Sequence, residues 1–207
     1  MINFISMISK LLFLFLFWVI YFAIHSVLAD LKVKSILIRK IPGLKKTYRL
    51  LYNIVAVVTL LPVLLYGALI PVRYIFPPSQ ILVFIGLAFS TWGIIVMKKS
   101  FSYYNLKSFL GVAQLKNPDV RESEGLKTNG ILGQVRHPLY SGGLLIIAGF
   151  MLFSPSYANW VTSFSLILYT IIGTKLEERK LVIEFGEAYK TYQKKVPMLI
   201  PFPRTRK

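Results

Sequence analysis

Hydrophobic residues gather in five long runs along the chain, separated by short segments rich in charged residues, proline and glycine. A helix needs about 20 apolar residues to cross the hydrocarbon core of a bilayer. None of the runs shows the sustained alternation of barrel strands, and lipid offers backbone groups no hydrogen-bond partners. The pattern therefore predicts an all-α integral membrane bundle of five transmembrane helices, which cover Leu11–Ala29, Leu50–Ile70, Ile81–Met97, Leu139–Phe153 and Trp160–Thr174.

The last two runs differ from the others in length and in the residues that come after them. The fourth has about 15 residues, or about 22 Å of helix, so it is expected to thin the bilayer locally or to pack in a hairpin against the fifth. Beyond the fifth run, Leu181, Phe185, Tyr189 and Tyr192 recur at helical spacing until Pro197. This spacing predicts a C-terminal helix that leaves the membrane and lies at the cytoplasmic interface.

The chain shows no sign of division into separate folding units. The first run is expected to be a retained span and not a signal peptide, because it has no basic segment beyond Lys10 and no small-residue cleavage site before Asp30. Residues 1–207 are predicted to form a single domain, with three spans in 1–97 and the remainder in 98–207. The semi-apolar stretch Phe101–Leu115 is expected either to cover the cytoplasmic face as a lid or to form a surface loop with one interfacial helix.

The formal net charge of +17 is unevenly distributed between the loops. Lysine and arginine concentrate in the first loop, the third loop and the C-terminal tail, whereas Lys10 and Arg73 lie on the other side. By the positive-inside rule, the basic loops are cytoplasmic and the N-terminus is outside, in what we expect to be a bacterial inner membrane. Topology and attraction to anionic membrane lipid account for most of this charge, so no nucleic-acid partner is expected.

The chain contains no cysteine and two histidines, His25 and His137. The absence of cysteine excludes disulfides, thiolate nucleophiles and thiolate metal sites. A histidine-based metal centre would need both imidazoles, one from each end of the chain, so no metal site is expected.

A cation, an imidazole and a helix start coincide at Arg136-His137-Pro138-Leu139-Tyr140, just before the fourth run. Proline suits the first position of a helix, where its missing N–H and fixed φ carry no penalty. The free amides from Leu139 to Ser141 would then meet the positive end of the helix dipole and favour a carboxylate or phosphate. Arg136 adds two donors and His137 a donor or acceptor. The alternative is that these residues only mark the membrane boundary.

Two carboxylates, Glu177 and Glu178, come after the fifth run at the negative end of its helix dipole, where they are disfavoured. Consecutive helical side chains point about 100° apart. We therefore expect Glu177 to face a bound cation while Glu178 pairs outward with a basic neighbour such as Arg136. The alternative is a surface ion-pair cluster with Lys175 and Arg179. Together the two motifs suit a zwitterionic ligand that carries a further positive centre.

These motifs, with Phe185-Gly186 and Val196-Pro197 downstream, resemble the C-terminal signature of the membrane methyltransferases that include isoprenylcysteine carboxyl methyltransferase and phospholipid N-methyltransferases. The resemblance covers roughly residues 109–203. The N-terminal half, with His25-Ser26 and Tyr48-Arg49-Leu50-Leu51-Tyr52-Asn53, is more similar to methanethiol S-methyltransferase and NnrU-type membrane proteins.

The resemblance implies that S-adenosylmethionine binds at the cytoplasmic ends of the last two spans. His137 and Tyr140 would hold this cofactor, and Glu177 would lie near its amino or sulfonium end, with His137 and Glu177 as the catalytic candidates. Glu124, Gly125, Leu126 and Lys127 would supply backbone contacts to the adenosine, and Gln114 a side-chain contact. The other residues predicted for the cofactor site are Arg136, Pro138, Leu139 and Glu178.

Two positions depart from the family pattern. Leu132 stands where an aromatic residue is frequent, and Gly173 stands where the eukaryotic branch has an arginine that contacts the prenylcysteine carboxylate. A small apolar or lipophilic acceptor is therefore expected, first a thiol such as methanethiol, whose proton His137 or a glutamate would accept. The alternatives are an isoprenylcysteine-type carboxyl or phospholipid amine methyltransferase, and a non-enzymatic NnrU-type accessory protein or transporter. The acceptor and the oligomeric state stay open.

Overall fold

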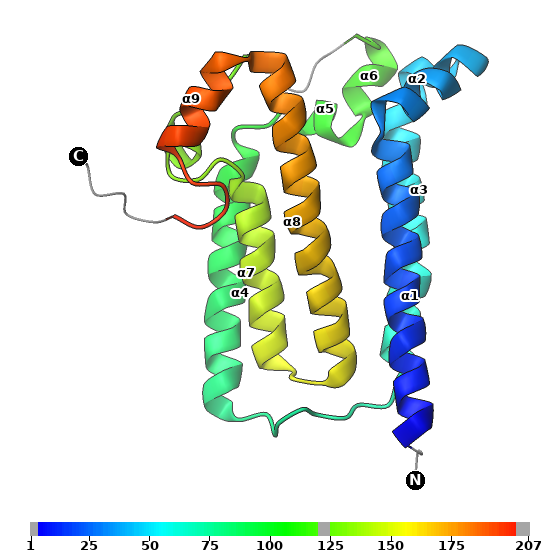
Figure 1. Ribbon diagram of the computed structural model, residues 1–207, viewed down its shortest axis with the longest axis vertical. Helices are drawn as coiled ribbons and strands as arrows, with labels where there is room; N and C mark the ends of the chain where they lie inside the picture. Colours follow the sequence, from blue (N-terminus) through cyan, green and yellow to red (C-terminus); the bar gives the residue numbers. More distant parts are fainter. Residues whose placement is uncertain (1–3, 120–124, 202–207) are drawn as a thin grey trace. The chain divides into compact units, whose positions relative to one another are not determined.

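The computed structural model describes residues 4–119 and 125–201, and the regular elements in these ranges are helices (Figure 1). The all-α prediction is confirmed. The elements are α1 (Phe4–Ala29), α2 (Leu31–Lys40), α3 (Leu44–Leu69), α4 (Gln80–Phe101), α5 (Leu106–Leu110), α6 (Val112–Lys116), the 3₁₀ helix η1 (Gly130–Gly133), α7 (Pro138–Phe153), α8 (Tyr157–Phe185) and α9 (Glu187–Lys195).

Contacts divide the chain into two compact units. The first unit comprises Met1–Pro77, Asn105–Glu122 and Pro155–Ser165, and the second comprises Pro78–Tyr104, Ser123–Ser154 and Leu166–Lys207. Helix α8 contributes its first turns to one unit and the rest to the other. The single-domain organisation stays a prediction.

Three helices of the described chain are long and apolar enough to cross a membrane. They are Ile5–Ala29, Leu44–Leu69 and Gln80–Phe101. Helix α7 is also apolar but has 16 residues, and α8 runs for 29 residues, well past the end of the fifth hydrophobic run. The chain is thus an integral membrane protein, and five spans remain the number proposed.

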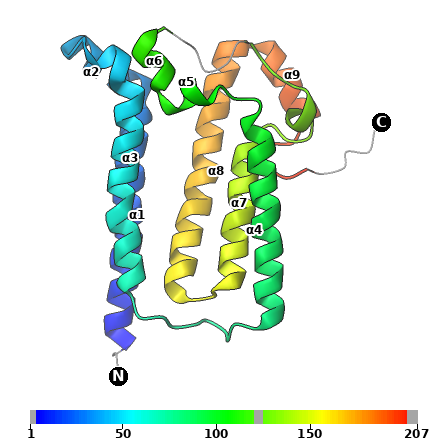
Figure 2. The same ribbon diagram turned by 180° about the vertical axis from the view of Figure 1, so that it is seen from behind.

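The first unit is built on α1 and α3, which lie side by side (Figures 1 and 2). The rings of Phe17 and Tyr66 meet edge to face with centroids 4.8 Å apart. The Tyr48 hydroxyl donates to the Leu28 carbonyl at 2.8 Å and so ties the start of α3 to the end of α1. In the connection between α1 and α3, Asp30 caps α2, because its carboxylate accepts hydrogen bonds from two amides in the first turn of that helix.

Helices α5 and α6 pack against the start of α3 within the first unit. Gly111 joins them with φ of 88°, a left-handed conformation, and a Cβ there would collide with the backbone of Leu50. The Arg49 guanidinium donates to the Phe109 carbonyl at 2.9 Å at the end of α5. The stretch expected to hold at most one interfacial helix therefore holds two short ones, because Gly111 breaks it.

The core of the second unit is the close contact of α4 with α7, which run side by side in Figure 2. Glycines face each other across it: a Cβ on Gly93 would lie 2.6 Å from the Gly142 carbonyl oxygen, and one on Gly86 would lie 2.6 Å from that of Gly149. Small residues let helix backbones approach in lipid, where no hydrophobic force drives helices together. We call these four glycines the glycine seam.

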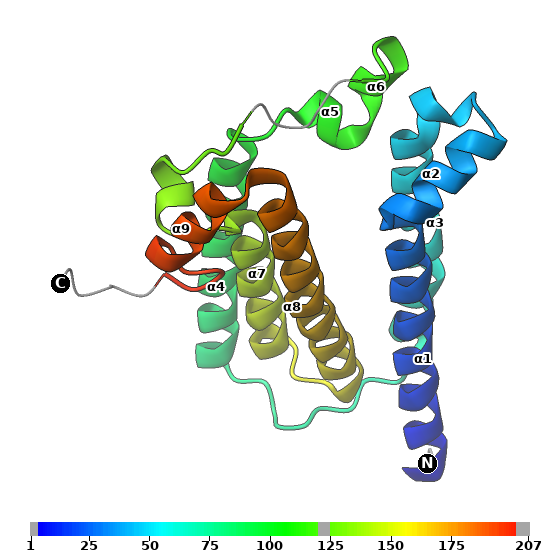
Figure 3. The ribbon, with the colours of Figure 1, turned by 45° about the horizontal axis from the view of Figure 1, so that its top comes forward.

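The C-terminal part of the second unit turns back at Gly186. The sequence predicts one helix running on from the fifth hydrophobic run, but the chain breaks at this glycine, whose φ is 58°. Helix α9 then lies beside the ends of α4 and α7 (Figure 3). Its Tyr189 and Tyr192 are buried with Val196 against Leu126 and neighbouring apolar residues. As predicted, the helix ends before Pro197.

Candidate functional site

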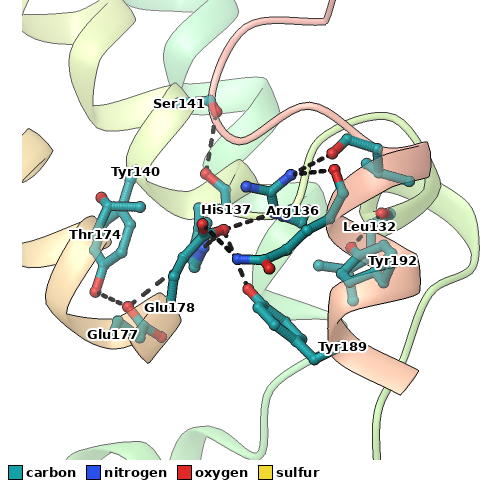
Figure 4. A network of polar contacts seen from close by, with 12 residues as sticks. Leu132, Arg136, His137, Tyr140, Ser141, Thr174, Glu177, Glu178, Tyr189 and Tyr192 are labelled. Carbon is teal, nitrogen blue, oxygen red and sulfur yellow. Dashed lines mark hydrogen bonds and ion pairs between the residues drawn. The ribbon is translucent and has the colours of Figure 1, made fainter. Parts of the chain in front are cut away.

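The start of α7 and the last turns of α8 bring the two predicted motifs together in the second unit (Figure 4). Pro138 occupies the first turn of α7, as the sequence predicts. Arg136 and His137 precede it, and Glu177 and Glu178 lie on α8. These four polar residues, together with Tyr140, form a connected set that we call the polar cluster.

Glu178 is the centre of the polar cluster. Its Oε1 accepts the Arg136 Nε–H at 2.6 Å, lies 3.1 Å from His137 Nε2 and accepts the Tyr189 hydroxyl at 3.2 Å. Its Oε2 accepts the side-chain amide of Gln193 at 3.0 Å. The side chains of Arg136 and Glu178 are 8% and 12% exposed, so this ion pair is buried. The predicted pairing with Arg136 is confirmed, but it points inward and not outward.

The electrostatics of Glu178 reflect these contacts. Burial by itself would raise the pKa of this carboxyl group, but hydrogen bonds from Arg136, His137 and Gln193 and the charge of Arg136 outweigh it. The net result is a lowered pKa, so Glu178 is ionised at neutral pH.

Glu177 has a different environment, although it is the adjacent residue. Its side chain is 41% exposed. Its Oε2 accepts the Tyr140 hydroxyl at 2.7 Å and lies 3.9 Å from His137 Nδ1. The Tyr140 ring stacks on the imidazole with centroids 5.7 Å apart. Glu177 therefore combines an ordered position with carboxylate surface that a ligand can reach.

Three tyrosines around the cluster are held in the neutral form. Burial and the charge of Glu177 raise the pKa of Tyr104 to about 12, and burial raises the pKa of Tyr192 to about 12. The pKa of Tyr189 is also raised, by burial and by the charge of Glu178. These phenols serve as donors, so the proton acceptors of the cluster are the His137 imidazole and the carboxylates.

The segment after α9 lies along the residues that begin α7. The amides of Arg136 and His137 donate to the carbonyls of Pro197 at 2.9 Å and Met198 at 3.1 Å, and the Ser141 hydroxyl donates to that of Leu199 at 2.6 Å. The Arg136 guanidinium also donates to the carbonyls of Gln193 and Val196.

These contacts occupy several of the donors that the sequence assigned to an anion site at the start of α7. Arg136 directs its donors to Glu178 and to main-chain carbonyls, and the Ser141 amide donates to the His137 carbonyl at 3.0 Å within the helix. The guanidinium therefore uses Nε for Glu178 and Nη1 for the chain's own C-terminal segment, and its part in binding a ligand stays a prediction.

The loop predicted to contact adenosine is partly described. Glu124 lies outside the described residues. Gly125 and Lys127 are exposed and Leu126 is half-buried. Leu126 packs against the tyrosines of α9, and the Lys127 ammonium donates to the Tyr103 carbonyl at 3.1 Å. The structure thus connects this loop to α9, which the sequence does not reveal.

Gln114 belongs to the first unit, on α6, and its part in the site stays a prediction. The side chain is 7% exposed. Its amide nitrogen donates to the Ser108 carbonyl at 3.1 Å, whereas Oε1 is buried with no hydrogen-bond partner in the described chain. Such an orphaned acceptor fits a ligand that brings an N–H donor.

Sequence reasoning did not single out Gln193 and Tyr104 as part of the site. Gln193 lies one helical turn beyond Tyr189 on the same amphipathic helix, which was a usable signal once α9 was predicted. Tyr104 offers no such signal, because its closeness to Glu177 depends on how the end of α4 meets α8.

Comparison with known proteins places this geometry in a family. A model of the phospholipid methyltransferase family matches residues 78–188, more than half of the chain. A methanethiol S-methyltransferase of a Pseudomonas species is 30% identical over 193 residues, which are 88% of this chain and 70% of the relative. The methanethiol S-methyltransferase of Pseudomonas deceptionensis is 32% identical over 53% of this chain and 42% of its own length.

A further relative belongs to another branch. Protein-S-isoprenylcysteine O-methyltransferase of Schizosaccharomyces pombe is 37% identical over 37% of this chain and 33% of the relative. No solved structure matches the chain significantly. These relatives are methyltransferases, so the non-enzymatic alternative is not supported. The chain belongs to the phospholipid methyltransferase family and is a membrane methyltransferase.

Proposed function

We propose that this enzyme transfers a methyl group from S-adenosylmethionine to a small apolar or lipophilic acceptor, first a thiol such as methanethiol. The observation that carries the proposal is the half-exposed carboxylate of Glu177 beside the buried His137. A carboxylate suits the ammonium or the sulfonium of the cofactor, because both are positive. From the family resemblance we also propose a side-chain contact from Gln114 to the adenosine.

The cofactor supplies an activated methyl group on a positive sulfur, so the protein needs no nucleophile of its own. The polar cluster contributes orientation and charge in a site with little water. Glu177 would hold positive charge, and Tyr140 keeps its Oε2 in place through the 2.7 Å hydrogen bond. A thiol must lose its proton when its sulfur forms the new bond to carbon, and His137 and Glu177 are the groups we propose to accept that proton.

The acceptor class is supported by Gly173 and by the relatives. Two of the relatives act, by their names, on methanethiol, and one of them is similar over 88% of this chain. Gly173 offers no cation to an acceptor carboxylate, and a buried unpaired carboxylate would cost several kcal/mol. A neutral acceptor avoids this cost.

We further propose five spans, with the polar cluster on the cytoplasmic side of an inner membrane and the N-terminus outside. The distribution of lysine and arginine between the loops supports this orientation. A reporter fused at Lys207 should then behave as cytoplasmic, and one inserted at Pro77 as external.

The function is tested with purified protein in detergent. Calorimetry should show binding of S-adenosylmethionine and of its demethylated product in the micromolar range, about −8 kcal/mol. Methyl transfer to a short alkyl thiol should exceed transfer to a farnesylated cysteine analogue. The absence of binding at millimolar ligand would contradict the cofactor proposal.

The second candidate is an isoprenylcysteine-type carboxyl methyltransferase, favoured by the similarity to the yeast enzyme. It can be separated from the first by Gly173→Arg. A Cβ at this position meets no atom within 4 Å, so the added Cβ causes no clash. The variant should gain turnover of the prenylcysteine relative to the thiol. Robust turnover of prenylcysteine by the unchanged enzyme, with none of the thiol, would favour this second function.

A further inference from the structure

Four side-chain donors surround the Glu178 carboxylate. They come from two segments: Arg136 and His137 before α7, and Tyr189 and Gln193 on α9 (Figure 4). A carboxylate offers about four lone-pair sites. Three of the four donors meet Oε1 and one meets Oε2, and the side chain is 12% exposed.

This set of internal donors distinguishes Glu178 from Glu177. Glu177 accepts the Tyr140 hydroxyl and keeps 41% of its side chain exposed. A ligand that bound Glu178 would have to reach a side chain that is 12% exposed and compete with the chain's own donors, and loss of a buried donor's partner is unfavourable. Of the two adjacent carboxylates, Glu177 is the one with room for a ligand.

The contact with Glu178 also decides where His137 carries its proton. The lowered pKa of Glu178 keeps the carboxylate ionised, and an ionised carboxylate is only an acceptor. The 3.1 Å contact with His137 Nε2 is then a hydrogen bond in which Nε2–H donates. In the neutral imidazole this leaves Nδ1 as the acceptor, and Nδ1 is the nitrogen 3.9 Å from Glu177.

We propose that Glu178 is a positioning residue and not a cofactor ligand. It holds His137 with the proton on Nε2 and Nδ1 toward Glu177, and it joins α9 to this arrangement through Tyr189 and Gln193. The docked α9 in turn packs against Leu126 of the loop predicted to contact the cofactor. The consequence for methyl transfer rests on the function proposed above, but the position of the proton does not.

Nuclear magnetic resonance of histidine-labelled protein tests the proposal directly, because the chain has two imidazoles, His25 and His137. Coupling patterns distinguish a protonated ring nitrogen from a bare one. In the wild type, His137 should show a protonated Nε2, with a downfield, slowly exchanging proton, and a bare Nδ1. Glu178→Leu should abolish that slowly exchanging proton, and Glu178→Asp should restore it in part.

The other histidine supplies a matched control. The Tyr52 hydroxyl lies 2.6 Å from His25 Nε2, so Tyr52→Phe should change the His25 signals and leave those of His137 alone. Tyr189→Phe removes a different donor from Glu178 and should leave the His137 proton in place. A bare Nε2 in the wild type would overturn the proposal even if every Glu178 variant failed to fold.

Binding and turnover provide the second readout. Glu178→Gln should lower kcat about 10- to 100-fold through misplacement of His137, while affinity for the demethylated product changes by less than about threefold. A loss of product affinity larger than that caused by Glu177→Gln would make Glu178 a ligand and overturn the proposal. A chain that bound no S-adenosylmethionine would refute the proposed function, whereas the His137 signals would still test the position of the proton.

Discussion

Helix α7 carries two regions of opposite character. Just before its start, Arg136 and His137 meet the buried carboxylate of Glu178 through directed hydrogen bonds. Farther along, Gly142 and Gly149 meet α4 through backbone contact alone. The polar cluster depends on specific hydrogen-bond donors and acceptors, whereas the glycine seam depends on the absence of Cβ atoms. In a membrane protein, which lacks the hydrophobic force between helices, both are ways to fix one arrangement.

The largest effect is expected where a buried charge loses its partner. Arg136→Leu leaves Glu178 buried without its cation and should destabilise the protein by about 3–5 kcal/mol in thermal or denaturant unfolding. Arg136→Leu combined with Glu178→Leu should recover much of this loss. The control is Lys190→Leu, which breaks an exposed pair with Glu187 and should change stability by less than about 0.5 kcal/mol. Equal effects from Arg136→Leu and the control would show that the buried pair has no special role.

The glycine seam should respond to the addition of one methyl group. A Cβ on Gly142 would lie 2.6 Å from Met97 Cγ and 2.7 Å from the Gly93 carbonyl oxygen. Gly142→Ala should therefore cost about 1–3 kcal/mol. The adjacent Gly143 has no atom within 4 Å of such a Cβ, so Gly143→Ala should be neutral or slightly stabilising. Loss of stability in both variants would point to helix flexibility and not to the seam.

The exposed carboxylate of the cluster, Glu177, should bind a positively charged ligand more tightly than a ligand of similar shape that lacks the charge. Glu177→Gln keeps the shape of the side chain and removes its charge, so binding of the sulfonium cofactor should weaken about tenfold more than binding of the neutral-sulfur product, or about 1.4 kcal/mol. Calorimetry with both ligands measures the difference. An equal loss would mean that Glu177 contacts the amino group that the two ligands share.

The smallest effect is a change in stability at acidic pH. The pKa of Glu178 is lower in the folded protein than its usual value of 4.5. Its stabilising contribution is therefore complete above the unfolded pKa and decreases as pH falls through the lower, folded one. Wild-type protein should lose stability from about pH 4.5 downward, and Glu178→Gln should lose less over the same range. Identical pH profiles would show that Glu178 is not specifically stabilised as a carboxylate.

The sequence by itself determined the local features of this protein. Hydrophobic runs predict the helices of the membrane, Pro138 marks the start of α7, and Pro197 lies just beyond the end of α9. The neighbouring carboxylates Glu177 and Glu178 could be given different partners, because the angle between adjacent helical side chains is fixed. These predictions succeed because each depends on the conformation of a few consecutive residues.

The tertiary structure decided which distant atoms meet. Nothing local shows that the Arg136 guanidinium donates to carbonyls of Gln193 and Val196, or that Gly93 faces Gly142. The inward position of Glu178 also depends on α9 turning back at Gly186, where the repeating pattern suggested a continuous helix. Periodicity describes one helix at a time, whereas contacts between helices depend on how their surfaces fit, and that fit is set only when the chain is packed.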